Sequence, residues 1–343
     1  MADGMGRIGP RPLTDTFGRQ VTYLRLSVTD RCDLRCTYCM AETMNFLPRK
    51  DLLTLEELEQ IADAFIRRGV TKIRITGGEP LVRRDIATLF DRLGSHLGNG
   101  LEELTLTTNA TLLTTHAAQL YAAGVRRVNI SLDTLKADVF RMITRRGDLS
   151  QTLAGIAAAK AVGLKVKINT VALKHQNAEE IPEMIAWAHE QGFDITLIEV
   201  MPLGLTGEDR YDQYIPLFEI RDRLEQSWTL TDAPALTTNA GPSRYAQVAQ
   251  TGGRVGFITP LTNNFCAGCN RVRVTCTGRI YMCLGHDDHI DLRAALRETA
   301  DPAAALDTAL DRALLGKPEK HAFGIRARAE APALPRHMSV TGG

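Results

Sequence analysis

The chain has 343 residues, of which 44% are hydrophobic and 24% charged, so it can bury one large core, or one large and one small. Its formal net charge of +1 excludes a global field that favours nucleic acid or a membrane, and any anion site must come from local clusters of Arg and Lys. No apolar run is long enough to span a bilayer, and the N-terminus lacks the apolar core of a secretory signal. We therefore expect a cytoplasmic protein.

Between Tyr23 and about Val200, short β-branched runs alternate with longer helical segments, which predicts repeated β/α units. Six parallel strands with crossover helices are compatible with a doubly wound sheet or a partial barrel. The expected strands are Leu24–Val28, Lys72–Ile75, Leu104–Thr107, Arg127–Ile130, Val166–Val171 and Ile195–Val200.

Two helices have recognisable ends. Thr54 with Glu57 predicts a capping box, and Gly69 supplies the left-handed residue that ends the same helix. Asn177 with Glu180 predicts a second helix start of the same kind, closed by Gly192.

Polar or otherwise unusual residues follow the same end of all six strands. They are Cys32–Cys39, Gly77–Pro80, Thr107–Asn109, Ser131–Asp133, Lys167 with Asn169, and Glu199–Met201. The carboxyl ends of parallel strands meet on one side of a sheet, so one shared cavity is predicted there. Ordinary turn chemistry explains only parts of the pattern.

The last third of the chain has a different pattern. Pro202–Pro216 is expected to be a long loop, and after Trp228 short strands carry hairpin signals. The expected strands are Arg244–Val248, Arg254–Ile258, Arg271–Thr275 and Arg279–Leu284, and the expected helices are Ile290–Leu296 and Pro302–Leu315.

A first cysteine triad, Cys32-x3-Cys36-x2-Cys39, comes directly after the first strand. Three thiolates suit a four-iron cluster that leaves one iron open for an outside ligand. A structural zinc ion is usually bound by four protein ligands, and no nearby His or Cys supplies the fourth. The spacing favours a cluster over zinc or buried thiols.

Cys266, Cys269 and Cys283 form a second triad without an obvious fourth ligand. Cys276 either packs in a turn or completes a four-cysteine site, and both alternatives stay open. We interpret His286–His289 as a solvated loop rather than a metal site.

Arg271 and Arg273 come just after Cys269, the second cysteine of this triad, and lie on one face of their predicted strand, because side chains alternate along a strand. Two guanidinium groups beside an open iron suit a phosphorylated substrate. An exposed, salt-bridged strand face explains the pair equally well at this point.

The sequence Cys-x3-Cys-x-Tyr-Cys after a first strand resembles the signature of the radical S-adenosylmethionine (SAM) superfamily. In that superfamily the amino and carboxylate groups of SAM chelate the open iron. Gly77–Pro80, read alone, is only a tight turn; after the second strand of such a chain, it resembles the motif that holds the amino group of SAM.

Further motifs across nearly the full chain are similar to those of the GTP 3′,8-cyclase family, which begins molybdenum cofactor biosynthesis. They are Tyr23–Asp30, Lys72–Pro80, Asn129–Asp133, Lys165–Asn169, Phe265–Arg273 and the terminal Gly342-Gly343. The resemblance implies an α/β fold, a partial (β/α)6 TIM-type barrel with a smaller C-terminal α+β domain. The expected parts are a mobile N-terminal tail (1–13), the barrel (14–229), the C-terminal domain with the second cluster (230–330) and a Gly-Gly tail (331–343).

The resemblance also implies the ligands. The cofactors are two [4Fe-4S] clusters, one on each triad, with SAM as cosubstrate. The implied SAM contacts are Tyr38, Gly78, Thr107, Ser131 and Met201, and the implied GTP contacts are Arg25, Arg74, Lys167, Arg271, Val272 and Arg273. The implied catalytic residues are Arg271, Arg273, Gly342 and Gly343.

The implied reaction is a radical cyclisation by a lyase. Reductive cleavage of SAM gives a 5′-deoxyadenosyl radical that removes the C3′ hydrogen of GTP, and the carbon radical then adds to C8 of guanine. The product is (8S)-3′,8-cyclo-7,8-dihydroguanosine 5′-triphosphate, and the second cluster binds the guanine. Implied partners are an electron donor, the downstream cyclic pyranopterin monophosphate synthase and a second copy in a homodimer, with no nucleic acid and no membrane.

Two positions depart from the family pattern. Ala110 stands where relatives usually have Gly, which matters only if the backbone needs a positive φ there. Thr196 stands where relatives often carry Arg, so one phosphate contact is missing or comes from elsewhere. The alternatives are another radical SAM enzyme with an auxiliary cluster, such as a peptide-modifying one, or a zinc-stabilised binding module.

Overall fold

The computed structural model describes residues 11–207, 209–234, 241–263, 265–321, 323, 334 and 336–342. In these ranges no helix is both long and apolar enough to cross a membrane. Most of the expected N-terminal tail and the predicted catalytic Gly343 lie outside the described residues, although Leu13 is described and buried.

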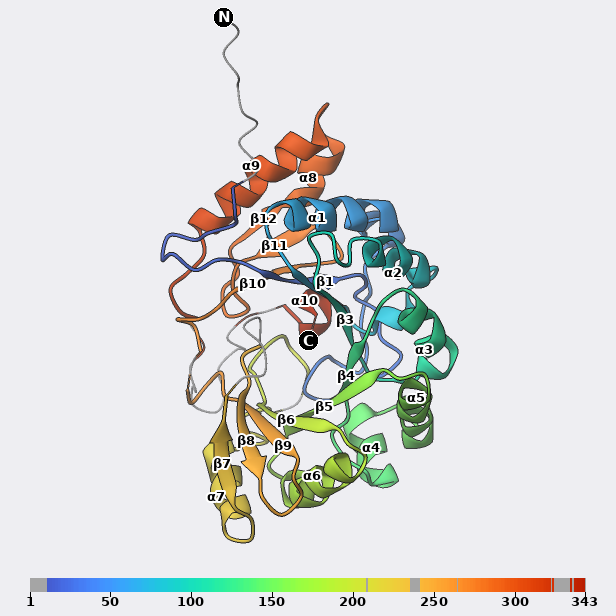
Figure 1. The fold of residues 1–343 in the computed structure, drawn as a ribbon, viewed down its shortest axis with the longest axis vertical. Coiled ribbons are helices and arrows are strands. Elements are labelled where there is room, and N and C mark those ends of the chain that lie inside the picture. The colour runs from blue at the N-terminus through green and yellow to red at the C-terminus, as the bar shows by residue number, and fades with distance from the viewer. Residues whose placement is uncertain are drawn as a thin grey trace, which may run out of the picture.

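Twelve described strands form one continuous, open sheet (Figure 1). The strands are β1 (Tyr23–Ser27), β2 (Lys72–Thr76), β3 (Glu103–Thr108), β4 (Arg127–Ser131), β5 (Lys165–Ala172), β6 (Asp194–Glu199), β7 (Leu230–Ala233), β8 (Arg244–Val248), β9 (Arg254–Ile258), β10 (Arg271–Val274), β11 (Arg279–Tyr281) and β12 (His289–Asp291). The order is β12-β11-β10-β1-β2-β3-β4-β5-β6-β9-β8-β7. From β10 through β9 every neighbouring pair is parallel, so the predicted partial barrel is confirmed.

Helices cover the outer face of this arc, and one short helix lies inside it (Figure 1). The helices are α1 (Leu55–Arg67), α2 (Ile86–Gly94), α3 (Leu113–Ala122), α4 (Ala137–Thr144), α5 (Leu149–Ala161), α6 (Ile181–Glu190), α7 (Leu217–Glu225), α8 (Leu292–Arg297), α9 (Pro302–Leu315) and α10 (Met338–Thr341). Figure 1 shows α10 and the C-terminal end near the centre of the ring of strands. The end of the chain therefore enters the space that the barrel surrounds.

The predicted start of α1 is confirmed. Thr54 accepts a hydrogen bond from the amide of Glu57, whose carboxylate accepts one from the amide of Thr54. Gly69 follows with φ of +92°, the left-handed conformation expected at the helix end. Local sequence determines both ends of this helix.

The second predicted capping box, at Asn177, is wrong. The Asn177 side chain accepts from the amide of Leu173, and the Glu180 carboxylate accepts from the hydroxyl of Thr134. A short 3-10 turn precedes α6, and neither side chain caps it. Both residues instead fasten the loop after β4 to the loop after β5, a tertiary use of the same residue types.

The C-terminal strands extend the barrel sheet at both edges. β9 joins β6 and β10 joins β1, both in parallel, and hairpin partners follow on the outside. The predicted strand Arg279–Leu284 ends at Tyr281, and the predicted helix Ile290–Leu296 is instead β12 followed by α8, which Asp291 caps. The division into two domains stays a prediction, because all described strands belong to one sheet.

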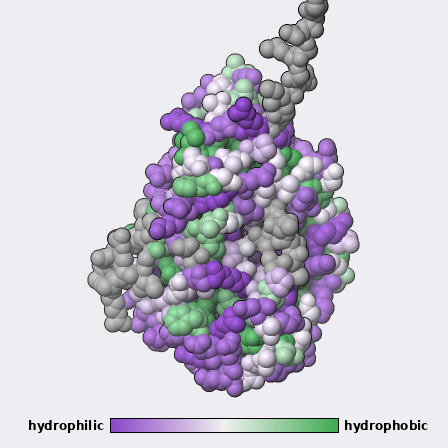
Figure 2. All heavy atoms as spheres, turned by 60° about the vertical axis from the view of Figure 1, so that its left-hand side comes forward, coloured by the Kyte–Doolittle hydropathy of each residue, from purple (hydrophilic) through white to green (hydrophobic). Residues whose placement is uncertain are grey.

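The face of the molecule in Figure 2 is mostly polar. On the face in Figure 2, hydrophobic residues form small, separate groups among hydrophilic ones. The large apolar side chains lie instead between the sheet and its helices, where one cluster runs from Leu13 to Leu314. The interior of the arc is different, because its wall is rich in charged and polar side chains.

Candidate functional site

A single cavity of about 970 Å³ lies inside the arc of strands. This volume is at the upper end for a small-molecule site. Its wall holds all six triad cysteines, every predicted SAM contact and every predicted GTP contact, which are Cys32, Cys36, Cys39, Cys266, Cys269, Cys283, Tyr38, Gly78, Thr107, Ser131, Met201, Arg25, Arg74, Lys167, Arg271, Val272 and Arg273. The structure therefore brings together residues as far apart in the sequence as Arg25 and Cys283, which are separated by 258 positions.

The loop after β1 carries the first triad, and neighbouring strand ends hold it in place. The Asp33 carboxylate accepts hydrogen bonds from Asn109 at 2.7 Å and from Thr111 at 2.6 Å. Arg35 donates to the carbonyl oxygens of Cys32 and Leu34 from within the loop. Burial raises the pKa of the Cys39 thiol to about 11. Such thiols are good thiolate ligands only when a metal replaces the proton.

The Gly77–Pro80 turn after β2 is built by close backbone approach. The amide of Gly78 donates to the carbonyl of Thr29 at 2.8 Å, and a Cβ on Gly78 would collide with the carbonyl of Arg31. Glu79 is buried and accepts from the amide of Asn109, and burial raises the pKa of its carboxyl to about 8. This turn therefore fixes the first triad loop against β3.

Tyr38 is oriented by a buried acid. Its hydroxyl donates to the carboxylate of Asp133 at 2.7 Å, and the amide of Val171 donates to the other oxygen at 2.8 Å. Burial raises the pKa of Asp133 to about 6, although both hydrogen bonds act in the opposite direction. Asp133 thus joins the first triad loop to the ends of β4 and β5.

Asp133→Asn should remove a pH dependence of stability. The folded pKa of about 6 lies above the ordinary value of about 3.9. The folded state therefore binds the proton more tightly, and the contribution of Asp133 to the free energy of unfolding falls by about 2 kcal/mol as the pH rises from about 4 to about 6. Urea unfolding of parent and variant at both pH values measures the difference. An equal difference at the two pH values would contradict the assignment.

Three guanidinium groups stand side by side on the cavity wall. Arg273 of β10, Arg25 of β1 and Arg74 of β2 share one register across three adjacent strands. Two residues earlier on the same strands, Tyr23 of β1 lies between Arg271 of β10 and Lys72 of β2. Like charges at neighbouring positions of a sheet repel each other, and an anion in the cavity would offset that repulsion.

Burial and neighbouring positive charges both act on the pKa values of this wall. Burial lowers the pKa of Arg25 to about 10 and also lowers that of Arg273. Burial works to raise the pKa of Tyr23, yet the nearby charges of Arg74 and Arg25 lower it below its usual value. A polyanion would relieve this field.

Lys167 approaches the cavity from β5 and contacts a residue that sequence reasoning missed. Its ammonium donates to the hydroxyl of Tyr245 on β8 at 2.5 Å, and burial lowers the pKa of this lysine. Thr196, on the neighbouring strand, is fully buried beside Gly256. Position 196 therefore supplies no charge to the cavity, while Tyr245 adds a hydroxyl beside Lys167.

Ala110 needs the left-handed conformation, with φ of +67° and complete burial. The departure from glycine at this position is therefore a costly one, since an L-residue in this region loses about 1–2 kcal/mol. The strain falls directly after Asn109, which binds both Asp33 and Glu79.

The second triad lies at the end of the β10–β11 hairpin. Because these strands are antiparallel, Cys269 just before β10 and Cys283 just after β11 come to the same end. Each sulfur accepts one hydrogen bond: Cys269 from Lys317 at 3.6 Å, Cys283 from the amide of Gly285 at 3.4 Å, and Cys266 from the amide of His321 at 3.5 Å. Burial works to raise the pKa of Cys269, but the charges of Arg271 and Lys317 lower it overall.

The structure also shows where Cys276 and the His286–His289 segment lie relative to the second triad. Cys276 is fully buried outside the cavity wall, so it packs in the core. His286 and His289 contact the carbonyl oxygens of Lys320 and Asp287. Within the described ranges, no three His, Cys, Asp or Glu side chains are gathered closely enough to hold a single metal ion.

The C-terminal segment enters the cavity beside the arginine row. Arg273 donates to the carbonyl of Gly342, and a Cβ on Gly342 would collide with the hydroxyl of Thr76. Farther out, Arg336 donates to the carbonyl of Leu284 at 2.5 Å and stacks on Tyr281. The tail is therefore held at two points rather than frayed.

Both triads fit four-iron clusters in their donor chemistry. Each supplies three cysteine sulfurs to one shared cavity and leaves room for a fourth, outside ligand. Backbone amides and Lys317 donate to the sulfurs of the second triad, as is typical around cluster thiolates.

Two family profiles match the chain. Residues 26–188 match the radical SAM superfamily, and residues 193–323 match the family described as Molybdenum Cofactor Synthesis C. The boundary between the two matches falls at the start of β6.

Curated relatives match over nearly the full length. The chain is 63% identical to GTP 3′,8-cyclase of Erythrobacter litoralis, over 96% of this chain and 98% of that protein. It is 59% identical to the enzyme of the same name from Rhizobium etli, over 97% and 94%. Among solved structures, SuiB of Streptococcus suis bound to S-adenosylmethionine has a TM-score of 0.59 at 17% identity, over 94% of this chain and 78% of that chain, a likeness of fold alone.

Proposed function

The chain belongs to the GTP 3′,8-cyclase family of the radical SAM superfamily, and on this premise we propose that it converts GTP to (8S)-3′,8-cyclo-7,8-dihydroguanosine 5′-triphosphate, the first step of molybdenum cofactor biosynthesis. One observation carries the proposal beyond family membership. A row of three guanidinium groups lies on a cavity wall that also holds two cysteine triads. This arrangement suits a triphosphate held beside a radical source.

The first triad, with Tyr38, Gly78, Thr107, Ser131 and Met201, is proposed to hold one [4Fe-4S] cluster and SAM. A cluster bound there would supply the electron for the cleavage of SAM into methionine and a 5′-deoxyadenosyl radical. The role of the chain is orientation: Asp133 holds Tyr38, and Glu79 holds the turn that contains Gly78.

The proposed GTP site lies between the triads. Arg25, Arg74 and Arg273 neutralise the triphosphate, with Lys167 and the hydroxyl of Tyr245 at the side opposite β10. Arg271 and Val272, and a second [4Fe-4S] cluster on Cys266, Cys269 and Cys283, hold the guanine end. Fixing both ends of GTP places C3′ and C8 of one molecule for reaction, which lowers the entropic part of the barrier.

Arg273 also binds the carbonyl of Gly342. We propose that this contact brings the Gly342-Gly343 tail against the substrate and excludes water from the radical. The close approach of Gly342 to Thr76 supports the proposal, because only a residue without a side chain fits there.

Three wider proposals follow from family membership and the sequence. The enzyme receives electrons from a separate donor, passes its product to cyclic pyranopterin monophosphate synthase, and forms a cytoplasmic homodimer. The proposed division is a barrel domain of residues 14–229 and a domain of residues 230–330 that carries the second cluster.

Anaerobic incubation of the reconstituted protein with SAM, dithionite and GTP tests the reaction. Mass spectrometry should detect 5′-deoxyadenosine together with a cyclic isomer of GTP, and omission of GTP should remove the isomer. If 5′-deoxyadenosine forms without a GTP-derived product, the radical chemistry stands and the cyclase proposal falls.

A further inference from the structure

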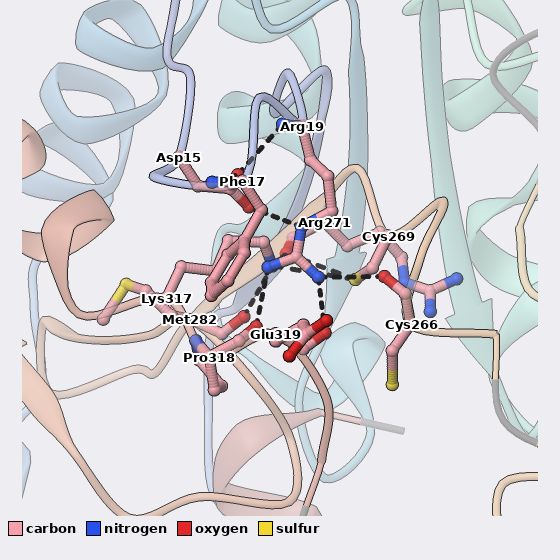
Figure 3. Close-up of polar contacts among 10 residues, drawn as sticks. All are labelled: Asp15, Phe17, Arg19, Cys266, Cys269, Arg271, Met282, Lys317, Pro318 and Glu319. Atoms are coloured by element: carbon pink, nitrogen blue, oxygen red, sulfur yellow. Dashed lines mark hydrogen bonds and ion pairs between the residues drawn. The ribbon is translucent and has the colours of Figure 1, made fainter.

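Lys317 is a buried cation beside the second triad. It comes two residues after α9, and only 3% of it is exposed. Its ammonium donates to the carbonyl oxygens of Arg271 and Met282, each at 2.9 Å, and to the sulfur of Cys269 at 3.6 Å (Figure 3). The three N–H donors of the ammonium thus have three acceptors.

None of these three acceptors is a carboxylate. Asp15, an acid drawn in Figure 3, pairs with Arg19, whose Nε lies 2.6 Å from its Oδ2. A buried ammonium without an opposite charge is costly, and neutral carbonyl groups offset only part of that cost. The group of opposite charge that hydrogen-bonds to this ammonium is therefore the thiolate of Cys269, and Cys283 and Asp15 also favour its charge.

Arg19 fixes the segment that carries Lys317. It donates to the carbonyl oxygens of Pro318 at 2.6 Å and Glu319 at 2.7 Å, and to that of Cys266 at 2.9 Å. The residues after Lys317 are thereby tied to the backbone of a triad cysteine, as Figure 3 shows. These contacts hold the backbone that follows Lys317 close to the second triad.

We propose that Lys317 is a positioning residue of the second cluster, held in place by Arg19. Its ammonium offsets the negative charge of a cluster bound to the triad, and its bond to the carbonyl of Arg271 fixes this cluster relative to the substrate arginines. The inference rests on the proposed function only in requiring a cluster at this triad. Reduction adds negative charge to a cluster, so a neighbouring cation makes reduction easier.

The test compares Lys317→Met with Lys320→Met, which removes the same charge from an exposed lysine three positions away. All proteins are reconstituted anaerobically, and the potential of each cluster is measured by titration followed by electron paramagnetic resonance, with SAM added to identify the first cluster. In Lys317→Met the second cluster should become harder to reduce, or iron should fall from about eight toward about four atoms per chain. The first cluster and Lys320→Met should match the parent.

Lys317→Arg keeps the charge and should restore the parent potential, which separates the proposal from a packing role. Unchanged potential and iron content in Lys317→Met would overturn it, as would a Lys317→Arg variant that behaves like Lys317→Met. Because no readout involves GTP, failure of the cyclase assay leaves this result interpretable. A parent protein that binds iron at the first triad alone would also overturn the proposal, because the proposal requires a cluster at the second triad.

Discussion

Cys36→Ala is expected to lower the iron content from about eight to about four atoms per chain and to abolish 5′-deoxyadenosine formation. Cys36 lies in the middle of the first triad, and its backbone carbonyl accepts the amide of Cys39, so the loop itself should survive the change. The cluster has no other cysteine within its loop to replace the lost ligand. Iron analysis after anaerobic reconstitution and chromatography of the SAM products measure both effects.

Cys276→Ala is the matched control, because Cys276 is a buried cysteine outside the cavity wall. It should keep about eight iron atoms and lose only about 1 kcal/mol of stability from the smaller side chain. SAM cleavage at the parent rate in Cys36→Ala would contradict the assignment of the first triad. A colourless, zinc-filled parent would contradict both triads.

Arg273→Ala is expected to reduce kcat/KM for GTP by about 100-fold while both clusters assemble. Arg273 is the member of the arginine row that also binds the carbonyl of Gly342, so its loss removes both a proposed phosphate contact and a contact to the tail. One buried hydrogen bond to a charged group contributes about 1.5–3 kcal/mol, and each 1.4 kcal/mol is a factor of about ten. Steady-state kinetics with GTP, alongside iron analysis, checks the result.

Arg84→Ala serves as control, because Arg84 is largely exposed and pairs only with its neighbour Asp85 among the described ion pairs. It should have parent kinetics. Loss of iron together with activity in Arg273→Ala would make Arg273 structural instead of substrate-binding.

Much of the fold follows from short stretches of sequence. Each of the six barrel strands was expected within one residue or so of its observed bounds, because β-branched runs lie between helix signals such as Thr54 and Gly69. The cavity followed from a physical rule, since the ends of parallel strands share one side. The topology predicts that these residues lie together, and the sequence motifs predict which of them bind a cluster, SAM or GTP.

Three features of the structure could not be predicted from the sequence, because they depend on strand register or on contacts between distant segments. No spacing rule shows that Arg273, Arg25 and Arg74 share one row, because β10 and β1 are far apart along the chain. Asn177 and Glu180 look like a helix start locally, yet loop contacts decide their use. Lys317 carries no motif; its role is visible only where its ammonium meets Cys269.

The pairing of β10 with β1 has a consequence for how the protein is made. The inner strand β1 is among the first segments to leave the ribosome. The edge of β1 that pairs with β10 nevertheless stays unpaired until most of the chain has been synthesised. Contacts of such long sequence separation slow folding, and an open strand edge invites aggregation meanwhile. The first triad lies on an early segment, whereas the second is complete only when Cys283 has emerged. The ligands of the first triad are therefore available to iron earlier in synthesis than the full set of the second.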